Sequence, residues 1–454
     1  MGGGAMTAAA PAQVRATTVR IGAAMGKTGA AALASALLAA IGTKIIAVWM
    51  GPGWVGFLGT LTQTRQTALV AATANGQTAL VQGVTSRQGR ESGDFLRTAL
   101  ALIAAATCAV AVGILVARER IAASVGLASG SGEFIAWLSV AVVLASAAGV
   151  MTALVNAFGE IGRLAKFQLA GPAATAVLAA PAAIAGTRGA LVAMLVASAA
   201  VSLAAAAWSL GGYWGNVRAW VCAGRFCWTA AGQFVSISGA MAFTGAIASA
   251  GLLAVRARII RQAGLGAAGN FDAAWAISMN QATLVLASMQ TYYLPELARA
   301  PGAAARREHV TMVMRMAILV SAPVIAAIGL LKPVVISLLY SGKFSGAAEL
   351  LRWTLIGDYL KVTSWVLAIP MIAAADMRAF LAADALAQAV FLGLSFALAV
   401  WRGPAQAAAL GFAVSYAVNL VFCYGYVRRK LAWNFRPVAI LWFAGLALVV
   451  AANR

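Results

Sequence analysis

The chain has 454 residues, of which 62% are hydrophobic and only 10% are charged. One membrane-spanning helix needs about 20 apolar residues, so this composition excludes an ordinary soluble protein and predicts a polytopic membrane protein. The apolar runs lack the short alternating pattern of barrel strands, so the expected fold class is all-α. The net charge of +21 does not indicate nucleic-acid binding, because basic loops are typical of membrane proteins.

Twelve apolar runs predict twelve core transmembrane helices, and a weaker run predicts a possible thirteenth helix at residues 437–453. In chain order the twelve are 28–50, 54–82, 98–117, 133–157, 165–186, 189–213, 227–255, 267–293, 313–338, 347–375, 379–401 and 405–427.

The predicted spans divide into two sets of six. Residues 1–27 are rich in Gly, Ala and Thr and are expected to form a disordered cytoplasmic tail. A cytoplasmic linker at 214–226 separates an N-terminal six-helix lobe, 28–213, from a C-terminal one, 227–430; an extra segment, 431–454, follows. Six plus six helices is the pattern of transporters built from two repeats around a central cavity.

The distribution of basic residues predicts the orientation. With the N-terminus inside, the inner loops carry almost twice as many Lys and Arg residues as the outer loops. Cytoplasmic loops are enriched in these residues, so we expect the N-terminus in the cytoplasm.

The second predicted span is unusually polar. Thr60, Gln63, Thr64 and Thr67 follow helical spacing and define one face, which must contact protein or water. These side chains could equally join helices or line a pore. Arg65 is a stronger functional candidate, because a charge within a span is costly and usually faces an interior cavity.

Other cations lie near the outer ends of spans. Lys44 ends the first span, where its ammonium could bind substrate or extend to the lipid headgroups. Arg256, Arg258 and Arg261 end the seventh span against the general charge bias. An anionic ligand would explain them, as would outer-leaflet phosphates.

The stretch "LIGDYLKVTSW" puts Asp358 and Lys361 on one helix face, where they are expected to pair. The pair could be structural or could bind substrate. Asp272, Asn280 and Gln281 make the eighth span polar and, like Gln63, are candidate sugar or ion contacts.

Little in the sequence indicates an enzyme. The one histidine lies on an inner loop, and the four cysteines lack metal spacing, so no catalytic residue, metal or cofactor is expected. A membrane glycosyltransferase or glycan polymerase is therefore the weaker hypothesis. The basic residues within spans favour a carrier of an anionic substrate.

Four stretches from Val255 onward carry a family resemblance: "VRARIIRQAGLGAAGNFDAAWAIS", "TYYLPELA", "LLYSGKFSGAAELLRWTLIGDYLKV" and "YVRRK". They resemble the bacterial polysaccharide-transport flippases of the Wzx type. Their superfamily also holds lipid II flippases and multidrug and toxin extruders. A looser match, "GTKIIAVWMGPGWVGF", extends the resemblance over roughly residues 28–430.

The resemblance implies two six-helix lobes around a cationic cavity that opens alternately to each side of the bacterial cytoplasmic membrane. It implies that an undecaprenyl-pyrophosphate-linked oligosaccharide, such as an O-antigen unit, moves from the inner to the outer leaflet. A glycan polymerase and a chain-length regulator would be further partners. An ion-coupled extruder of small molecules is the alternative.

The resemblance also assigns substrate-binding residues. Lys44, Arg256, Asp358 and Lys361 lie in matched text; Arg258 is added as a neighbour of Arg256, and Arg65 is a candidate mainly because it lies within a span. We expect Lys44, Arg65, Arg256 and Lys361 to converge on one water-accessible cavity. The chain departs from the family in "GNFDAAWAIS", where Phe271 replaces a frequent Trp and Asp272 an uncharged polar residue.

Overall fold

A computed structural model describes residues 33–87 and 89–454, except for the side chains of 161, 240, 241, 283–292 and 295. Within these ranges the chain is helical and contains no β-strand, which confirms the all-α fold class. The predicted disordered tail, 1–27, and the start of the first predicted span, 28–32, lie outside the described residues.

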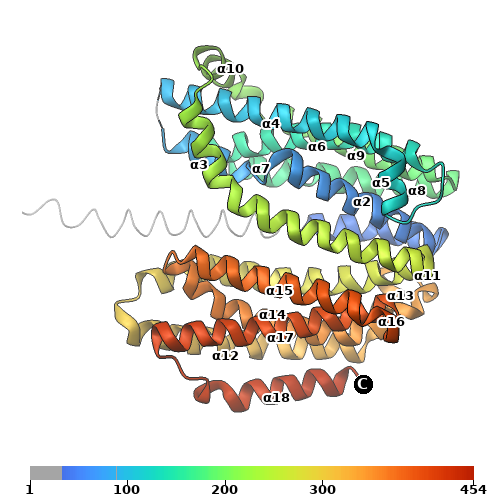
Figure 1. Cartoon of the computed structure of the whole chain (residues 1–454), viewed down its shortest axis with the longest axis vertical. Coiled ribbons are helices and arrows are strands. Elements are labelled where there is room, and N and C mark those ends of the chain that lie inside the picture. The colour runs from blue at the N-terminus through green and yellow to red at the C-terminus, as the bar shows by residue number, and fades with distance from the viewer. Residues whose placement is uncertain (1–32, 88) are drawn as a thin grey trace, which may run out of the picture. The chain divides into compact units, whose positions relative to one another are not determined.

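The first described helix is Leu33–Trp49. The elements that follow are α2 (Pro52–Thr73), α3 (Gln77–Thr85), α4 (Arg90–Val116), α5 (Arg118–Ser124), α6 (Gly132–Ala157), α7 (Ile161–Phe167), α8 (Ala170–Ala185), α9 (Arg188–Ser209), η1 (Gly211–Tyr213), α10 (Trp214–Ala223), α11 (Trp228–Arg299), α12 (Gly302–Leu330), α13 (Lys332–Leu339), η2 (Gly342–Phe344), α14 (Ser345–Ala373), α15 (Met377–Ala397), α16 (Ala399–Arg402), α17 (Pro404–Leu431) and α18 (Arg436–Ala452) (Figure 1).

The protein is a multi-pass membrane protein. Within the described ranges, 9 helices are long and apolar enough to cross a bilayer, and Leu33–Trp49 and α18 are shorter apolar helices. The nine do not include α2, because its polar side chains lower its hydropathy. Whether α18, the predicted thirteenth span, crosses the membrane stays a prediction.

The predicted span 54–82 is not one helix. α2 ends at Thr73 and α3 begins at Gln77, and between them Ala74 and Asn75 have left-handed φ angles of 49° and 51°. An Asn side chain tolerates this conformation better than most residues, and a glycine follows it in the sequence. The sequence prediction missed this break because it read the polar residues here as one face of a continuous helix, although Asn-Gly is a turn signal.

The predicted spans 227–255 and 267–293 both fall within α11, which is interrupted at Gly264 (φ 81°, ψ 173°). Only glycine adopts this conformation readily. Arg256 and Asp272 form an ion pair of 2.6 Å, although 16 residues of straight helix would separate them by about 24 Å. The chain therefore reverses at Gly264, and α11 is two helices in space.

The chain forms two compact units, each made of separate segments. The first comprises residues 1–43, 68–116 and 136–239, as far as they are described, and the second comprises 44–67, 117–135 and 240–454. The expected division at linker 214–226 into two contiguous six-helix lobes stays a prediction.

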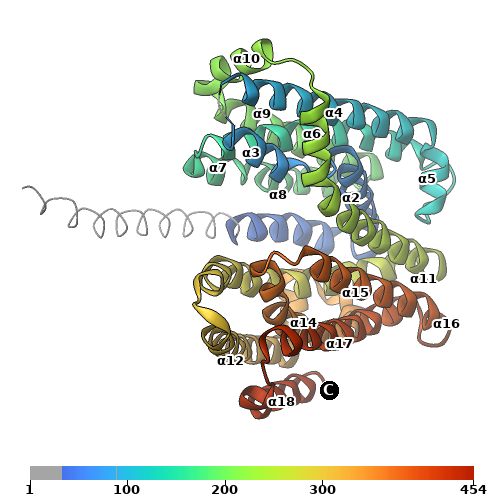
Figure 2. The same cartoon turned by 60° about the vertical axis from the view of Figure 1, so that its left-hand side comes forward.

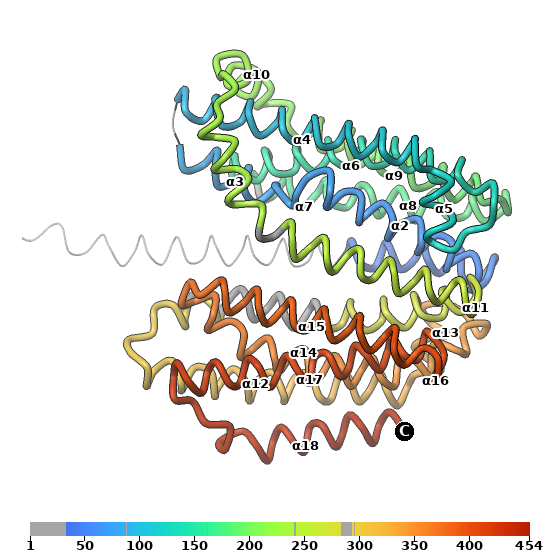
Figure 3. Tube along the Cα trace, in the orientation of Figure 1, coloured from blue at the N-terminus to red at the C-terminus, as the bar shows by residue number. Residues whose placement is uncertain are grey.

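In the first unit, α8 packs against α9, and α10 packs across the end of α4 (Figure 3). The core of this unit contains Phe95, Leu96, Leu154 and Phe234, all nearly inaccessible. Phe95 fills the space beside Gly83, where a Cβ would lie 1.9 Å from the ring. Large apolar side chains therefore pack against small residues here, as in other membrane-helix interfaces.

In the second unit, α14 packs against α17 and α12, and α17 also packs against α15 (Figure 1). α18 lies along α12 (Figure 2). The Tyr359 hydroxyl of α14 donates to the Trp442 carbonyl of α18 (2.8 Å). The helix α14 is the most buried of the candidate spans; its Asp358 is buried and its Lys361 is half-buried, whereas Glu349 and Arg352 are exposed.

The backbones of α2 and α11 touch directly. A Cβ on Gly56 would lie 2.2 Å from the Leu265 carbonyl oxygen, and one on Gly269 would lie 1.9 Å from the Pro52 carbonyl oxygen. Small residues permit this close approach of two membrane helices. It brings the polar face of α2 against both halves of α11.

We expect Gly269→Ala to destabilise the protein by at least about 1–3 kcal/mol, because the added methyl group requires a backbone shift. Gly266→Ala is the matched control, since its Cβ would meet nothing within 4 Å and lies on the same helix. Thermal unfolding in detergent checks this. Equal melting temperatures for the two variants would contradict the close packing.

Candidate functional site

The first charged cluster is an ion pair inside the second unit. Nη2 of Arg256 lies 2.6 Å from Oδ1 of Asp272, and the two residues are only 7% and 8% exposed. Arg256 comes from the first half of α11 and Asp272 from the second, so the turn at Gly264 brings them together. Mutual neutralisation lowers the cost of burying both charges.

The backbone of α2 packs against this ion pair, which lies between the two halves of α11. A Cβ on Gly59 would lie 1.8 Å from Oδ2 of Asp272 and 3.0 Å from Nη1 of Arg256. Among the described residues, Nε and Nη1 of Arg256 have no hydrogen-bond partner. The guanidinium thus retains donors that could bind an anion.

Part of the polar face of α2 forms hydrogen bonds with α11. Nε2 of Gln63 donates to the Ser249 carbonyl (3.1 Å), and Oγ1 of Thr67 lies 3.0 Å from Oγ of Ser249. Thr60 and Thr64 instead donate to carbonyls of their own helix at 2.7 and 2.8 Å. For Gln63 and Thr67 the structure therefore supports contact between helices, one of the two alternatives left open by the sequence.

The other candidate cations each have their own neighbours. Nζ of Lys44 donates to the Leu338 carbonyl at the end of α13 (2.5 Å). The guanidinium of Arg258 lies 5.3 Å from the ring centre of Phe396. The Nε atoms of Arg65 and Arg258 are buried without a hydrogen-bond partner among the described residues. Convergence of the cations on one cavity stays a prediction.

The second charged cluster surrounds Asp358, which is completely buried in α14. Its Oδ1 accepts a hydrogen bond from Ser278 and its Oδ2 accepts one from Gln281, both at 2.9 Å. Both donors come from the second half of α11. Asp358 is therefore satisfied by neutral donors, and it joins α14 to α11.

The expected Asp358–Lys361 ion pair does not form, since the two charged groups are not within 4.0 Å of each other. Nζ of Lys361 lies 3.4 Å from the Met279 sulfur and 5.9 and 5.4 Å from the ring centres of Phe412 and Tyr416. Helical spacing correctly put both residues on one face, but Ser278 and Gln281 occupy the carboxylate.

Sequence analysis did not identify several of the residues that surround Asp358 and Lys361. Ser278, Phe412 and Tyr416 surround Asp358 and Lys361, but isolated serines and aromatic residues carry no signal in an apolar chain. Trp275, whose ring centre is 5.0 Å from that of Phe412, extends the aromatic wall. Asn280, a predicted sugar or ion contact, is exposed.

The described residues contain no cluster of three or more His, Cys, Asp or Glu residues that could hold a metal. The candidate cations Lys44, Arg256, Arg258 and Lys361 instead have aromatic rings, a carbonyl, a thioether and the Asp272 carboxylate as contacts. Such an arrangement can bind and release an anion through hydrogen bonds and charge.

No family model matches the chain. Over 148 residues it is 30% identical to the lipid III flippases of Escherichia coli (strain K12) and Shigella flexneri. The match covers 31% of this chain and 34% of each relative, so the chain spans about a third of the length of these curated relatives.

Solved structures match over almost the full length. A lipid II flippase MurJ in an inward closed conformation superposes with a TM-score of 0.72, 11% identity, and coverage of 93% of this chain and 91% of that chain. An inward-facing multidrug resistance MATE family transporter of the MOP superfamily superposes with a TM-score of 0.71, 14% identity, and coverage of 87% and 95%. The chain therefore has the fold that these proteins share.

Proposed function

We propose that this protein is a flippase of the Wzx type, which moves an undecaprenyl-pyrophosphate-linked oligosaccharide from the inner to the outer leaflet of the bacterial cytoplasmic membrane. Its fold and the partial match to lipid III flippases support this proposal. It works by alternating access between two six-helix lobes, with its N-terminus in the cytoplasm.

The observation that carries the proposal is the environment of Lys361. Its ammonium lies within a candidate membrane span and contacts a thioether and two aromatic rings, while Asp358 and Asp384 act on it only electrostatically, without a direct ion pair. No carboxylate of the described residues lies within 4.0 Å of it. A pyrophosphate would supply the missing negative charge by charge-assisted hydrogen bonds.

Arg256 would contribute a second cationic group, since two of its nitrogens lack a partner among the described residues. Arg65, Arg258 and Lys44 complete the proposed set of cations. Sugar hydroxyls would meet polar groups such as Gln63, Asn280 and Gln281. In this scheme Asp358 orients α14 against α11 and so positions Lys361.

The main alternative is an extruder of small molecules, which the likeness to MATE transporters favours. A cavity for cationic drugs needs acidic residues, whereas the candidate site residues here are mostly basic, with Lys44, Arg65, Arg256, Arg258 and Lys361 against Asp272 and Asp358. This excess favours an anionic substrate.

Expression in a bacterial strain that lacks its own glycan flippase tests the proposal. We expect surface glycan to be restored and drug tolerance to stay unchanged. Restored glycan in a Lys361→Met strain, or raised drug tolerance without glycan, would contradict the proposed substrate.

A further inference from the structure

The first unit contains a basic pocket that the proposed transport pathway does not use. It lies between the α7–α8 junction and the end of α9, and its volume is about 560 Å³. Its lining includes Arg163, Lys166, Phe167, Trp208, Ser209 and Gly212. The pocket therefore combines two cationic groups with aromatic and small apolar walls.

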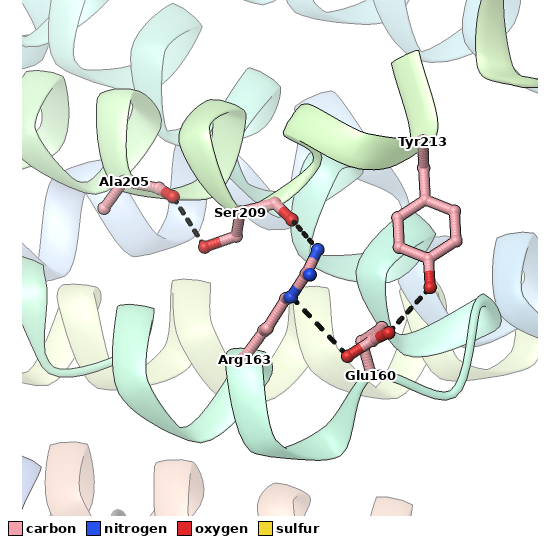
Figure 4. A network of polar contacts seen from close by, with 5 residues as sticks. All are labelled: Glu160, Arg163, Ala205, Ser209 and Tyr213. Carbon is pink, nitrogen blue, oxygen red and sulfur yellow. Dashed lines mark hydrogen bonds and ion pairs between the residues drawn. The ribbon is translucent and has the colours of Figure 1, made fainter. Parts of the chain in front are cut away.

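A hydrogen-bonded network holds Arg163 at this pocket (Figure 4). Its Nε lies 3.6 Å from Oε2 of Glu160, and its Nη1 donates to the Ser209 carbonyl (3.4 Å). The Tyr213 hydroxyl donates to Oε1 of the same carboxylate (2.6 Å), and this bond raises the pKa of Tyr213. The network orients the guanidinium and uses only some of its five N–H donors.

The pocket is open beside this guanidinium. Gly212 forms the adjacent wall, and a Cβ there would lie 3.9 Å from Nη1 of Arg163. Lys166 follows Arg163 by three residues on the same helix, so both point to one side. Among the described residues, no hydrogen bond or ion pair is recorded for the Lys166 ammonium, so the pocket keeps a positive charge after Glu160 offsets Arg163.

The pocket lies at one end of a candidate membrane span. It is lined by Ser209, the last residue of the candidate span Arg188–Ser209. Trp208 is 85% exposed and Trp214, on the following turn, is 42% exposed. Exposed Trp residues at the end of a span are typical of the boundary between hydrocarbon and headgroups. A cationic site therefore meets apolar walls at the end of a candidate span, where we expect lipid phosphates.

We propose that this pocket binds the phosphate group of an anionic membrane phospholipid, with Arg163 and Lys166 as its ligands and the first part of an acyl chain against Trp208 and Phe167. Basic pockets between membrane helices are suited to such headgroups. Arg163 acts as the fixed ligand because the network orients it, and Lys166 acts as the adaptable one.

The test is lipid binding to the purified full-length protein, so it does not depend on transport activity. Dioleoylphosphatidylglycerol and dioleoylphosphatidylcholine are titrated separately and counted by native mass spectrometry. Lys166→Gln leaves the network intact, whereas Arg163→Gln combined with Lys166→Gln removes both ligands. Arg218→Gln, an exposed basic residue on α10, is the charge-matched control.

We expect wild type to bind phosphatidylglycerol saturably and in preference to phosphatidylcholine. Affinity falls about fivefold in Lys166→Gln and about thirtyfold in the double variant, and stays unchanged in Arg218→Gln. Equal losses in Lys166→Gln and Arg218→Gln would mean binding to general surface charge and would overturn the proposal. Binding of undecaprenyl phosphate but not of phosphatidylglycerol would assign the pocket to the carrier lipid and would also overturn it.

Discussion

Replacing Arg256 by Met is expected to lower the free energy of unfolding by about 3–5 kcal/mol, because Asp272 would keep a buried charge without its partner. The double variant Arg256→Met/Asp272→Leu is expected to unfold within about 1 kcal/mol of wild type, because it leaves no uncompensated charge. Thermal unfolding in one detergent measures both effects.

Arg258→Met is the control for this experiment, since Arg258 lies two residues away and contacts an aromatic ring and no carboxylate among the described residues. We expect a small loss of stability there. A double variant as unstable as Arg256→Met would contradict the ion pair as the reason for destabilisation. If Arg256 also binds pyrophosphate, the stable double variant will still fail to transport.

Lys361→Met is expected to reduce transport about 10- to 100-fold with little change in the melting temperature. One charge-assisted hydrogen bond to a phosphate is worth about 1.5–3 kcal/mol, which corresponds to that reduction. The Met side chain can keep the contacts with Phe412, Tyr416 and Met279, so the variant removes mainly the charge. Transport in vesicles and unfolding are measured on the same preparation.

Lys361→Arg is the matched control, because it retains the positive charge, and we expect it to keep most of the transport. Asp358→Ala should instead unfold at lower temperature, since the Ser278 hydroxyl and the Gln281 amide lose their acceptor. Adding Lys361→Met should not rescue Asp358→Ala, because the two charges do not pair. Rescue by the second substitution would contradict the observed contacts.

Helix positions could be predicted well from the sequence wherever apolar runs ended at clear loops, as in α6, α9 and α14. The prediction failed at Asn75, where left-handed backbone breaks the span predicted at 54–82, whereas the reversal at Gly264 lies in the interval expected between the predicted spans 227–255 and 267–293. Hydropathy reports burial in lipid and carries little information on backbone direction, so it did not show the break at Asn75.

Sequence analysis named individual candidate residues but not the contacts between them. Helical spacing gave Asp358 and Lys361 a common face, yet the true partners of Asp358 are almost 80 residues away in the chain. Arg256 and Asp272 were both candidates, but their pairing depends on the turn at Gly264. The glycines spaced by three in "GPGWVGFLG" were the available signal for close packing of α2.

The most direct test of the proposed function is flipping in vesicles. The purified protein is reconstituted with an undecaprenyl-pyrophosphate-linked oligosaccharide that carries a fluorophore, and an impermeant quencher measures the fraction exposed outside. We predict exchange between leaflets well above the protein-free rate for wild type and for Lys361→Arg, and a rate near the protein-free rate for Lys361→Met. A folded wild-type protein that exchanges this lipid no faster than empty vesicles would contradict the account.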